Sequence, residues 1–331
     1  MRTVFKCTLL FSFLILSGTL LAQNHPIMKD PFAHTFSIVA RDSVTGEMAV
    51  GVQSHWFSVG PLVAWGKSGV GVVATQSFVN PAYGPNGLKL MEEGKSASLA
   101  LEELVAEDEG EAYRQVSFLD SSGRTAAHTG SNCVESAFHY SGKNYSVQAN
   151  MMLNDDVVPA MKAAFLEYSN LPLAERVVKV LQAAQNVGGD IRGKQSAALI
   201  VVKGTKVKNS WEDKSIDLRV DDNAEPLVEI ERLLTVARAY EFMNKGDLAM
   251  EAEDVDGALK QYGSAEKLFP DNLEMKYWKA VALANSKRFD EAIPIFKAIF
   301  KAEDNWRVMT MRLPASGLLN VSKEELEKII N

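Results

Sequence analysis

The sequence predicts an α+β domain with antiparallel sheets, followed by a second domain built only of helices. Up to residue 222, blocks of strand-like segments alternate with blocks of helical segments, without the strict strand–helix alternation that parallel sheets require. From residue 223 to residue 331 every pattern is helical. A length of 331 residues also suits about two domains, at roughly 150 residues per domain.

The composition is that of a globular protein, with 47% apolar and 23% charged residues. The formal net charge is −7. An acidic protein gains no binding free energy from the release of counterions from a phosphate backbone, so we expect no nucleic-acid partner. Of the two cysteines, Cys7 lies in a segment that we expect to be removed, which leaves Cys133 alone. An internal disulfide and a cysteine-rich metal site are therefore not expected.

Residues 1–22 have the pattern of a secretory signal peptide. Arg2 and Lys6 form a basic start, residues 9–16 are apolar, and a cleavage site with a small residue at its end follows at Ala22. We expect an exported protein, periplasmic or extracellular, with no membrane span, because no later segment has 18 uninterrupted apolar residues. Loss of the signal would change the formal net charge from −7 to −9.

The first elements of the α+β domain follow a polar leader at residues 23–34. Apolar runs at residues 35–42 and 47–55 flank a turn rich in Asp, Ser and Gly, which predicts a β-hairpin. Residues 61–65 and 69–76 are apolar enough to be strands buried on both faces.

Two helices and three strands are expected next. Residues 87–93 and 96–105 have helical periodicity, and a serine opens the second segment as an N-cap. Strand signals return at residues 115–119, 125–128 and 145–150.

The last elements of the domain are two helices and two strands. Residues 157–168 and 173–186 are helical, and a proline opens the second helix while two glycines close it. Residues 196–202 and 216–220 are the last strands. An acidic, proline-containing linker at residues 221–226 then leads into the helical domain.

A 34-residue repeat runs through the helical domain. Small and aromatic residues recur at this spacing, in the pairs Gly246 and Ala280, Val255 and Phe289, Ala258 and Ala292, and Tyr262 and Phe296. Paired antiparallel helices meet at such positions, and the pattern resembles about two tetratricopeptide repeats with a capping helix. Because so few repeats are seldom stable alone, we expect the module to dock on the first domain or to form a homo-oligomer, and to bind a protein partner.

Several stretches of the first domain resemble the DUF1028 family, which is assigned to the N-terminal-nucleophile (Ntn) hydrolase superfamily. They are residues 35–42, 52–57, 69–84, 127–130 and 188–198. The resemblance covers residues 35–220 almost throughout and implies an αββα sandwich. By superfamily analogy it also implies cleavage of an amide bond, without a cofactor and with no substrate established.

Thr35 is the candidate nucleophile that the resemblance implies, because it starts the first strand. The superfamily uses an N-terminal Thr, Ser or Cys whose own α-amine accepts the hydroxyl or thiol proton. Lys67, which is 32 positions later, is a candidate helper that holds down the pKa of the nucleophile, and Asn150 is a candidate donor. Signal cleavage leaves twelve residues in front of Thr35, so a second cut must free its amine.

Substrate-binding candidates come from three places. The loop at residues 76–84 concentrates amide and hydroxyl groups between chain breakers. An Asp and an Arg two residues apart could pair or grip a carboxylate, and a Ser–His pair ends the hairpin with side chains on opposite faces. The candidates are Gln76, Asn80, Tyr83, Asp190, Arg192, Ser54 and His55. His128 and His139 have no metal-ligand partners at suitable spacing, so no metal site is expected.

Two functions remain open from the sequence. The first is an exported amidohydrolase that acts on a small peptide or a cell-wall-derived molecule through Thr35. The alternative is a non-catalytic protein whose first domain binds a small polar ligand while the repeats recruit a protein partner. The chain end in front of Thr35 separates the two, because only a free amine can serve as the base.

Overall fold

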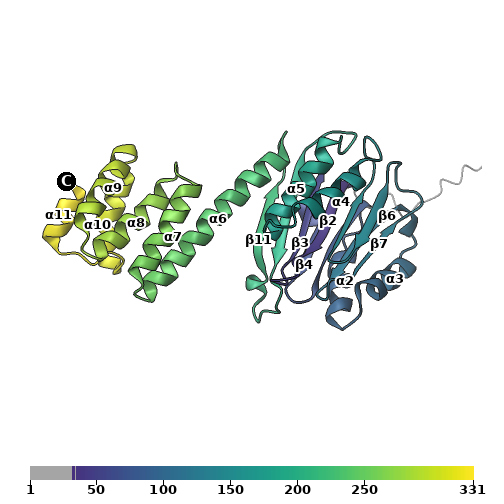
Figure 1. Cartoon of the computed structure of the whole chain (residues 1–331), viewed down its shortest axis with the longest axis horizontal. Helices are drawn as coiled ribbons and strands as arrows, with labels where there is room; N and C mark the ends of the chain where they lie inside the picture. Colours follow the sequence, from purple (N-terminus) through teal and green to yellow (C-terminus); the bar gives the residue numbers. More distant parts are fainter. Residues whose placement is uncertain (1–31, 34) are drawn as a thin grey trace, which may run out of the picture.

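The computed structural model describes residues 32, 33 and 35–331, so the expected signal peptide and most of the expected leader lie outside the described residues. The molecule is elongated, with the α/β domain at one end and the helical domain at the other (Figure 1). A long helix, α6 (Pro226–Glu251), joins them. Within the described range, no helix is long and apolar enough to cross a membrane.

The larger sheet of the α/β domain is antiparallel. Its strands, in sheet order, are β11 (Lys214–Val220), β10 (Ser196–Val202), β3 (Met48–Ser54), β2 (Thr35–Arg41), β9 (Tyr145–Ala149) and β8 (Phe138–Gly142). The central pair is the hairpin expected from the sequence, with Thr35 opposite Ser54 and Arg41 opposite Met48. The carboxylate of Asp42 fixes the turn by accepting two backbone N–H groups.

A smaller antiparallel sheet packs against the larger one. It has the order β1 (Phe32–Ala33), β5 (Gly71–Phe78), β6 (Arg114–Asp120) and β7 (Thr125–Thr129), and β4 (Ala64–Lys67) also pairs with β5. The prediction of a strand at residues 61–65 is wrong for residues 61–63 and right for residues 64–65, which lie in β4. Pro61 instead lies in the first turn of a short helix, α1 (Gly60–Val63), because proline suits that position.

Helices cover the outer faces of both sheets. The larger sheet packs on α4 (Val157–Glu167) and α5 (Leu173–Asn186), and the smaller sheet packs on α2 (Tyr83–Glu92) and α3 (Ala97–Glu107). A third apolar cluster, which includes Val39 and Val72, fills the space between the sheets. At Gly51 of β3, a Cβ would collide with Val177 of α5, so glycine allows this helix to approach closely. The layers are therefore helix, sheet, sheet, helix (Figure 1).

The helical domain consists of the end of α6 and the helices after it. These are α7 (Val255–Leu268), α8 (Leu273–Asn285), α9 (Phe289–Ala302), α10 (Asn305–Ser316) and α11 (Lys323–Ile330). A Cβ on Gly246 of α6 would strike the Tyr262 ring of α7, so these two helices meet at a close contact. The matching residues one repeat later, Ala280 and Phe296, are fully buried in the next helix pair. The 34-residue spacing thus corresponds to repeated helix packing.

Helix α6 packs into both domains. Leu227, Ile230 and Leu234, from its first half, belong to the apolar core over the larger sheet. Ala239 and Met243, from its second half, pack with α7 and α8. The expected domain boundary after residue 222 precedes α6, whereas the change of packing lies inside the helix. The helical module is therefore docked on the first domain through a shared helix.

Candidate functional site

Buried polar groups gather at one end of the sandwich, where strand ends from both sheets meet. Thr35 begins β2, Ser54 ends β3, Gln76 lies near the end of β5, Gln115 lies near the start of β6, and Asn150 follows β9. All five are fully buried. Buried polar side chains need hydrogen-bond partners, so this end, the site end, holds an ordered polar network.

The side chain of Thr35 faces the space between the sheets. Its neighbour Phe36 lies in the core under α4 and α5, and side chains alternate along a strand. Ser37, two residues on, confirms the direction because its Oγ donates to Gln76 Oε1 across the sheets at 2.6 Å. The Thr35 carbonyl accepts from Gln76 Nε2 at 2.9 Å and from the backbone N and Nδ2 of Asn150 at 3.2 Å and 3.4 Å.

Gln115 is the centre of this network. Its Oε1 accepts from Gln76 Nε2 at 2.7 Å and from Asn150 Nδ2 at 2.9 Å. Its Nε2 donates to the Ala149 carbonyl and to Thr129 Oγ1, both at 2.9 Å. A side-chain amide nitrogen has two hydrogens, so Gln76 and Asn150 each use both within the protein. We therefore assign these two amide nitrogens to holding Thr35 in place. The expected substrate contact of Gln76 stays a prediction, and it would have to be made by its side-chain oxygen, which accepts from Ser37.

The network reaches the surface through Thr129 and His139. Thr129 Oγ1 lies 2.8 Å from His139 Nδ1, and partial burial together with the neighbouring His128 lowers the pKa of His139. Both residues line a cavity of about 500 Å³, which Cys133 and Glu135 also line. Burial raises the pKa of the Cys133 thiol, which disfavours the reactive thiolate.

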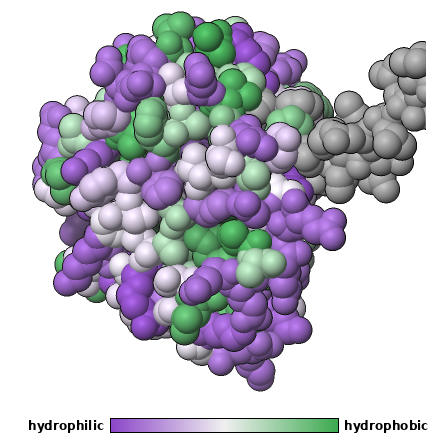
Figure 2. Space-filling model, turned by 90° about the vertical axis from the view of Figure 1, so that its right-hand side faces the viewer, coloured by the Kyte–Doolittle hydropathy of each residue, from purple (hydrophilic) through white to green (hydrophobic). Residues whose placement is uncertain are grey.

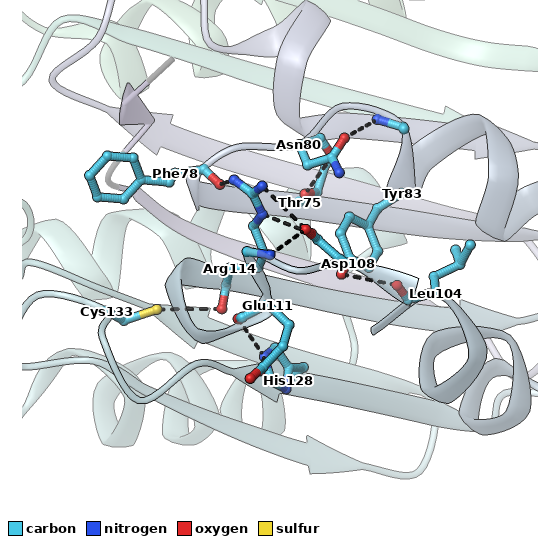
Figure 3. A network of polar contacts seen from close by, with 12 residues as sticks. Thr75, Phe78, Asn80, Tyr83, Leu104, Asp108, Glu111, Arg114, His128 and Cys133 are labelled. Atoms are coloured by element: carbon cyan, nitrogen blue, oxygen red, sulfur yellow. Dashed lines mark hydrogen bonds and ion pairs between the residues drawn. The ribbon is translucent and has the colours of Figure 1, made fainter. Parts of the chain in front are cut away.

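A buried ion pair fixes the neighbouring end of β5. Arg114 Nε contacts Asp108 Oδ2 at 2.9 Å, and Arg114 Nη1 donates to the Phe78 carbonyl at 2.7 Å (Figure 3). Burial alone would raise the pKa of Asp108, but hydrogen bonds from Arg114 and the Gly110 backbone outweigh it and lower that pKa. Burial and the nearby Asp108 carboxylate raise the pKa of Tyr83.

Asn80 and Tyr83 line a second cavity beside this ion pair, of about 390 Å³. Asn80 Oδ1 accepts from the Ala82 backbone N at 3.1 Å, and its carbonyl accepts from Thr75 Oγ1 at 3.2 Å. Asn80 therefore stabilises its own turn while it faces the cavity. Glu107 and Glu109 on the rim are exposed, which makes this cavity acidic.

Asp190 and Arg192 form the pair that the sequence allowed. Arg192 Nη2 contacts Asp190 Oδ2 at 2.7 Å, and the same carboxylate oxygen accepts from the His55 backbone N at 3.1 Å. Asp190 is buried, and its carboxylate ties the chain just after β3 to the loop after α5. The His55 side chain is exposed, whereas Ser54 is buried, so the two do not act on each other.

Lys67 lies at the opposite end of the sandwich, so the structure does not bring it to Thr35. It pairs in register with Gly71 at the start of β5, five residues before Gln76. At roughly 3.3 Å per residue, that places it about 16 Å along the strand from the site end. Its Nζ contacts Glu92 Oε2 at 2.6 Å instead.

Backbone strain also marks the site end. Ser58, Ser77, Ser136 and Met151 have positive φ angles of 52°, 74°, 56° and 59° without being glycine. Each lies within a few residues of a strand end at the site. Such residues cluster at functional sites because the surrounding structure must hold them there.

Sequence reasoning missed the centre of the network and its route to the surface. Gln115 and Gln148 are glutamines inside strands, and Ser37 is a small polar residue in an apolar strand. The signal that could have found them is alternation, since Ser37, Gln76, Gln115 and Gln148 all fall on the strand faces turned to the other sheet. No group of acidic, His and Cys residues in the described part of the chain could hold a metal ion.

Comparison with known proteins finds a matching family model for each of the two domains. The model of a family described as "Family of unknown function (DUF1028)" matches residues 35–230, and a tetratricopeptide-repeat model matches residues 243–305. A crystal structure of a DUF1028-model protein from Silicibacter pomeroyi is similar, with 28% identity and a TM-score of 0.56. The match covers 62% of this chain and 89% of that one. No functionally curated protein matches the chain.

Proposed function

The chain belongs to the DUF1028 family, and from its site we propose that the first domain is an Ntn-type hydrolase of αββα architecture that cleaves an amide bond through Thr35. The substrate would be a small peptide or a cell-wall-derived molecule. Cleavage of the bond between His34 and Thr35 releases the nucleophile.

The observation that carries the proposal is the placement of Thr35. It is the first residue of a central strand, its side chain faces the other sheet, and three N–H groups hold its carbonyl. An N-terminal nucleophile needs such a rigid setting, because its hydroxyl and its α-amine must act together. Gln76 and Asn150 supply that rigidity, and Gln115 fixes both of them.

The chemistry takes place in two stages. Hydrolysis before Thr35 consumes one water and yields a carboxylate on the leader and a free amine on Thr35. In the second stage the Thr35 hydroxyl attacks the amide carbonyl of the substrate, and its proton passes through the α-amine to the departing nitrogen. The C–N bond breaks, and a second water hydrolyses the resulting ester to restore Thr35.

The test is the N-terminus of the protein made by its native host, read by intact mass and sequencing. We expect the chain to begin at Thr35, the Thr35→Ala variant to stay uncut, and Thr35→Ser to be cut. Thr45→Ala, at an exposed turn of the same hairpin, is the matched control and should be cut normally. A wild-type chain that keeps residues before Thr35 would overturn the proposal and favour the non-catalytic ligand-binding alternative.

We further propose that the protein is exported and that its repeats bind a protein partner. The support is the signal-like segment at residues 1–22 and the repeat match, together with a cavity of about 280 Å³ between α6, α7 and α8. Fractionation of the native host tests export, since a full-length chain retained in the cytoplasm would overturn it. Loss of partner binding after Trp278→Ala, which alters that cavity, tests the second point.

A further inference from the structure

The residues in front of Thr35 pair with the opposite sheet. β1 is antiparallel to β5, with Phe32 opposite Phe78 and Ala33 opposite Ser77. Thr35 then begins β2 in the larger sheet, only two positions after Ala33 in the sequence. The chain on the acyl side of the proposed cut therefore lies on one sheet, and the nucleophile lies on the other.

β1 uses an edge of β5 that no other described strand covers. One side of β5 pairs with β6 over Gly71–Ser77, and the other side pairs with β4 only as far as Ala74. β1 adds on this second side, beyond the last pair with β4. Once the leader leaves, the backbone at Ser77 and Phe78 becomes an open edge, which is a template for another extended chain.

This part of β5 is held firmly. The guanidinium of Arg114, which is itself buried against Asp108, holds the Phe78 carbonyl at 2.7 Å (Figure 3). Ser77 has a φ of 74°, so the strand is locally bent beside the site. A preformed edge binds an extended chain at a lower entropic cost than a flexible one.

We infer that this edge receives the acyl side of the substrate, so the substrate is an extended peptide that adds to β5 in place of β1. The inference rests on the proposed function, and it treats the leader as the first substrate. Two residues of such a peptide would lie opposite Ser77 and Phe78, with the bond to be cut at Thr35.

The same geometry gives a charge preference. Because the peptide runs antiparallel to β5, its residues further upstream lie opposite Val79 and Asn80, beside the acidic cavity. Glu107 and Glu109 on its rim are exposed and make no ion pair with another described residue. A lysine or arginine one or two positions upstream of the paired segment would meet these carboxylates. Figure 2 shows that hydrophilic residues cover most of the face at this end of the molecule, with hydrophobic residues in separate groups.

The experiment measures peptide binding to protein produced with Thr35 as its first residue by removal of a tag. The probe is a synthetic peptide of residues 28–34, Met-Lys-Asp-Pro-Phe-Ala-His. Two variants carry a methyl group on the backbone nitrogen of either the phenylalanine or the alanine. In an antiparallel ladder only alternate residues exchange hydrogen bonds. One methylation should therefore weaken binding by about tenfold or more, and the other by less than about threefold.

A second pair of measurements tests the charge preference. Replacing the aspartate of the probe, which is two positions upstream of the paired segment, by lysine should strengthen binding about fivefold. The double variant Glu107→Gln, Glu109→Gln should remove that difference, while Glu102→Gln, which changes an exposed acid on the same helix as Glu107, should keep it.

Equal binding of both methylated peptides and the parent, or no binding of the parent, would overturn the inference. Failure of the proposed function would appear elsewhere, as a full-length chain that is never cut before Thr35. The two outcomes are separate because the binding measurement uses protein whose Thr35 was exposed by the tag.

Discussion

The two ends of the sandwich are built from the same strands but in opposite ways. The site end holds neutral amides and hydroxyls that are fully buried and bonded across the two sheets. The far end is closed by tight turns, where a Cβ on Gly69 would strike the Lys206 backbone, and by ion pairs at the surface, where Lys67 and Lys206 share Glu92. One end is constructed to hold polar groups in place and the other to join strands.

The largest effect should come from the centre of the network. Gln115→Leu removes the acceptor for Gln76 and Asn150, which leaves buried N–H groups unpaired, so the free energy of unfolding should fall by about 3–5 kcal/mol. Gln53 is the matched control. It is equally buried, but among the described residues its amide has no hydrogen-bond partner, so Gln53→Leu should be neutral or stabilising. Urea unfolding measures both, and equal losses would contradict the assignment of Gln115 as the centre.

The ion pair beside the site should give the next effect. Asp108→Asn removes the negative charge that pairs with the buried Arg114 guanidinium, so we expect the free energy of unfolding to fall by about 3 kcal/mol at pH 7. Because the folded pKa of Asp108 is lowered, wild type holds this stability above the unfolded value of about 3.8 and loses it as the pH falls toward the lowered folded value.

Thermal unfolding between pH 2 and 7 measures how stability depends on pH, and this dependence should be weaker in the Asp108→Asn variant than in wild type. Glu229→Gln in the exposed pair with Arg232 serves as the control and should change stability by less than about 0.5 kcal/mol. An Asp108→Asn protein as stable as this control would show that the pair does not hold β5.

A smaller effect of opposite sign should come from the strained strand end. Ser77→Gly relieves a φ of 74°, so it should raise the free energy of unfolding by about 1 kcal/mol. Ser117→Gly, in β6 without a positive φ, should lower it by about the same amount. Denaturant midpoints of the two variants measure the difference, and a destabilised Ser77→Gly protein would show that this backbone is not strained.

Much of the architecture could be predicted because it depends on local patterns. Alternation and turn residues predicted the central hairpin, and the 34-residue spacing predicted the helix packing at Gly246 and Tyr262. Strand β8 was missed because it is a short, partly exposed edge strand: Phe138 and Tyr140 alternate with polar residues, but five residues give a weak signal. The one-turn helix at Pro61 was mistaken for strand because four residues carry too little periodicity.

The site could be predicted only in part because it is formed by residues far apart in the chain. Thr35, Asn150 and Gln76 were singled out from resemblance and loop chemistry, and the structure brings them together. Gln115 was missed because its role depends on hydrogen bonds to residues 39 and 35 positions away. Lys67 was singled out by spacing alone, and spacing does not tell which end of a strand a residue reaches.

The smallest effect should come from Lys67, and it tests the comparison itself. Hydrogen bonds from Lys206 and Lys67 lower the pKa of Glu92 to about 2. Lys67→Met removes one of these partners but leaves Lys206, so the Glu92 pKa should rise toward its usual value while remaining lowered. Stability at pH 7 should change by less than about 1 kcal/mol, since the pair is partly exposed.

Cleavage before Thr35 should continue at the wild-type rate in the Lys67→Met variant, because Lys67 lies at the far end of the strand. Carbon NMR of the Glu92 carboxyl group and the N-terminal sequence measure the two outcomes. An uncut Lys67→Met chain would mean that the far end takes part in the chemistry, and the division between the two ends would no longer hold.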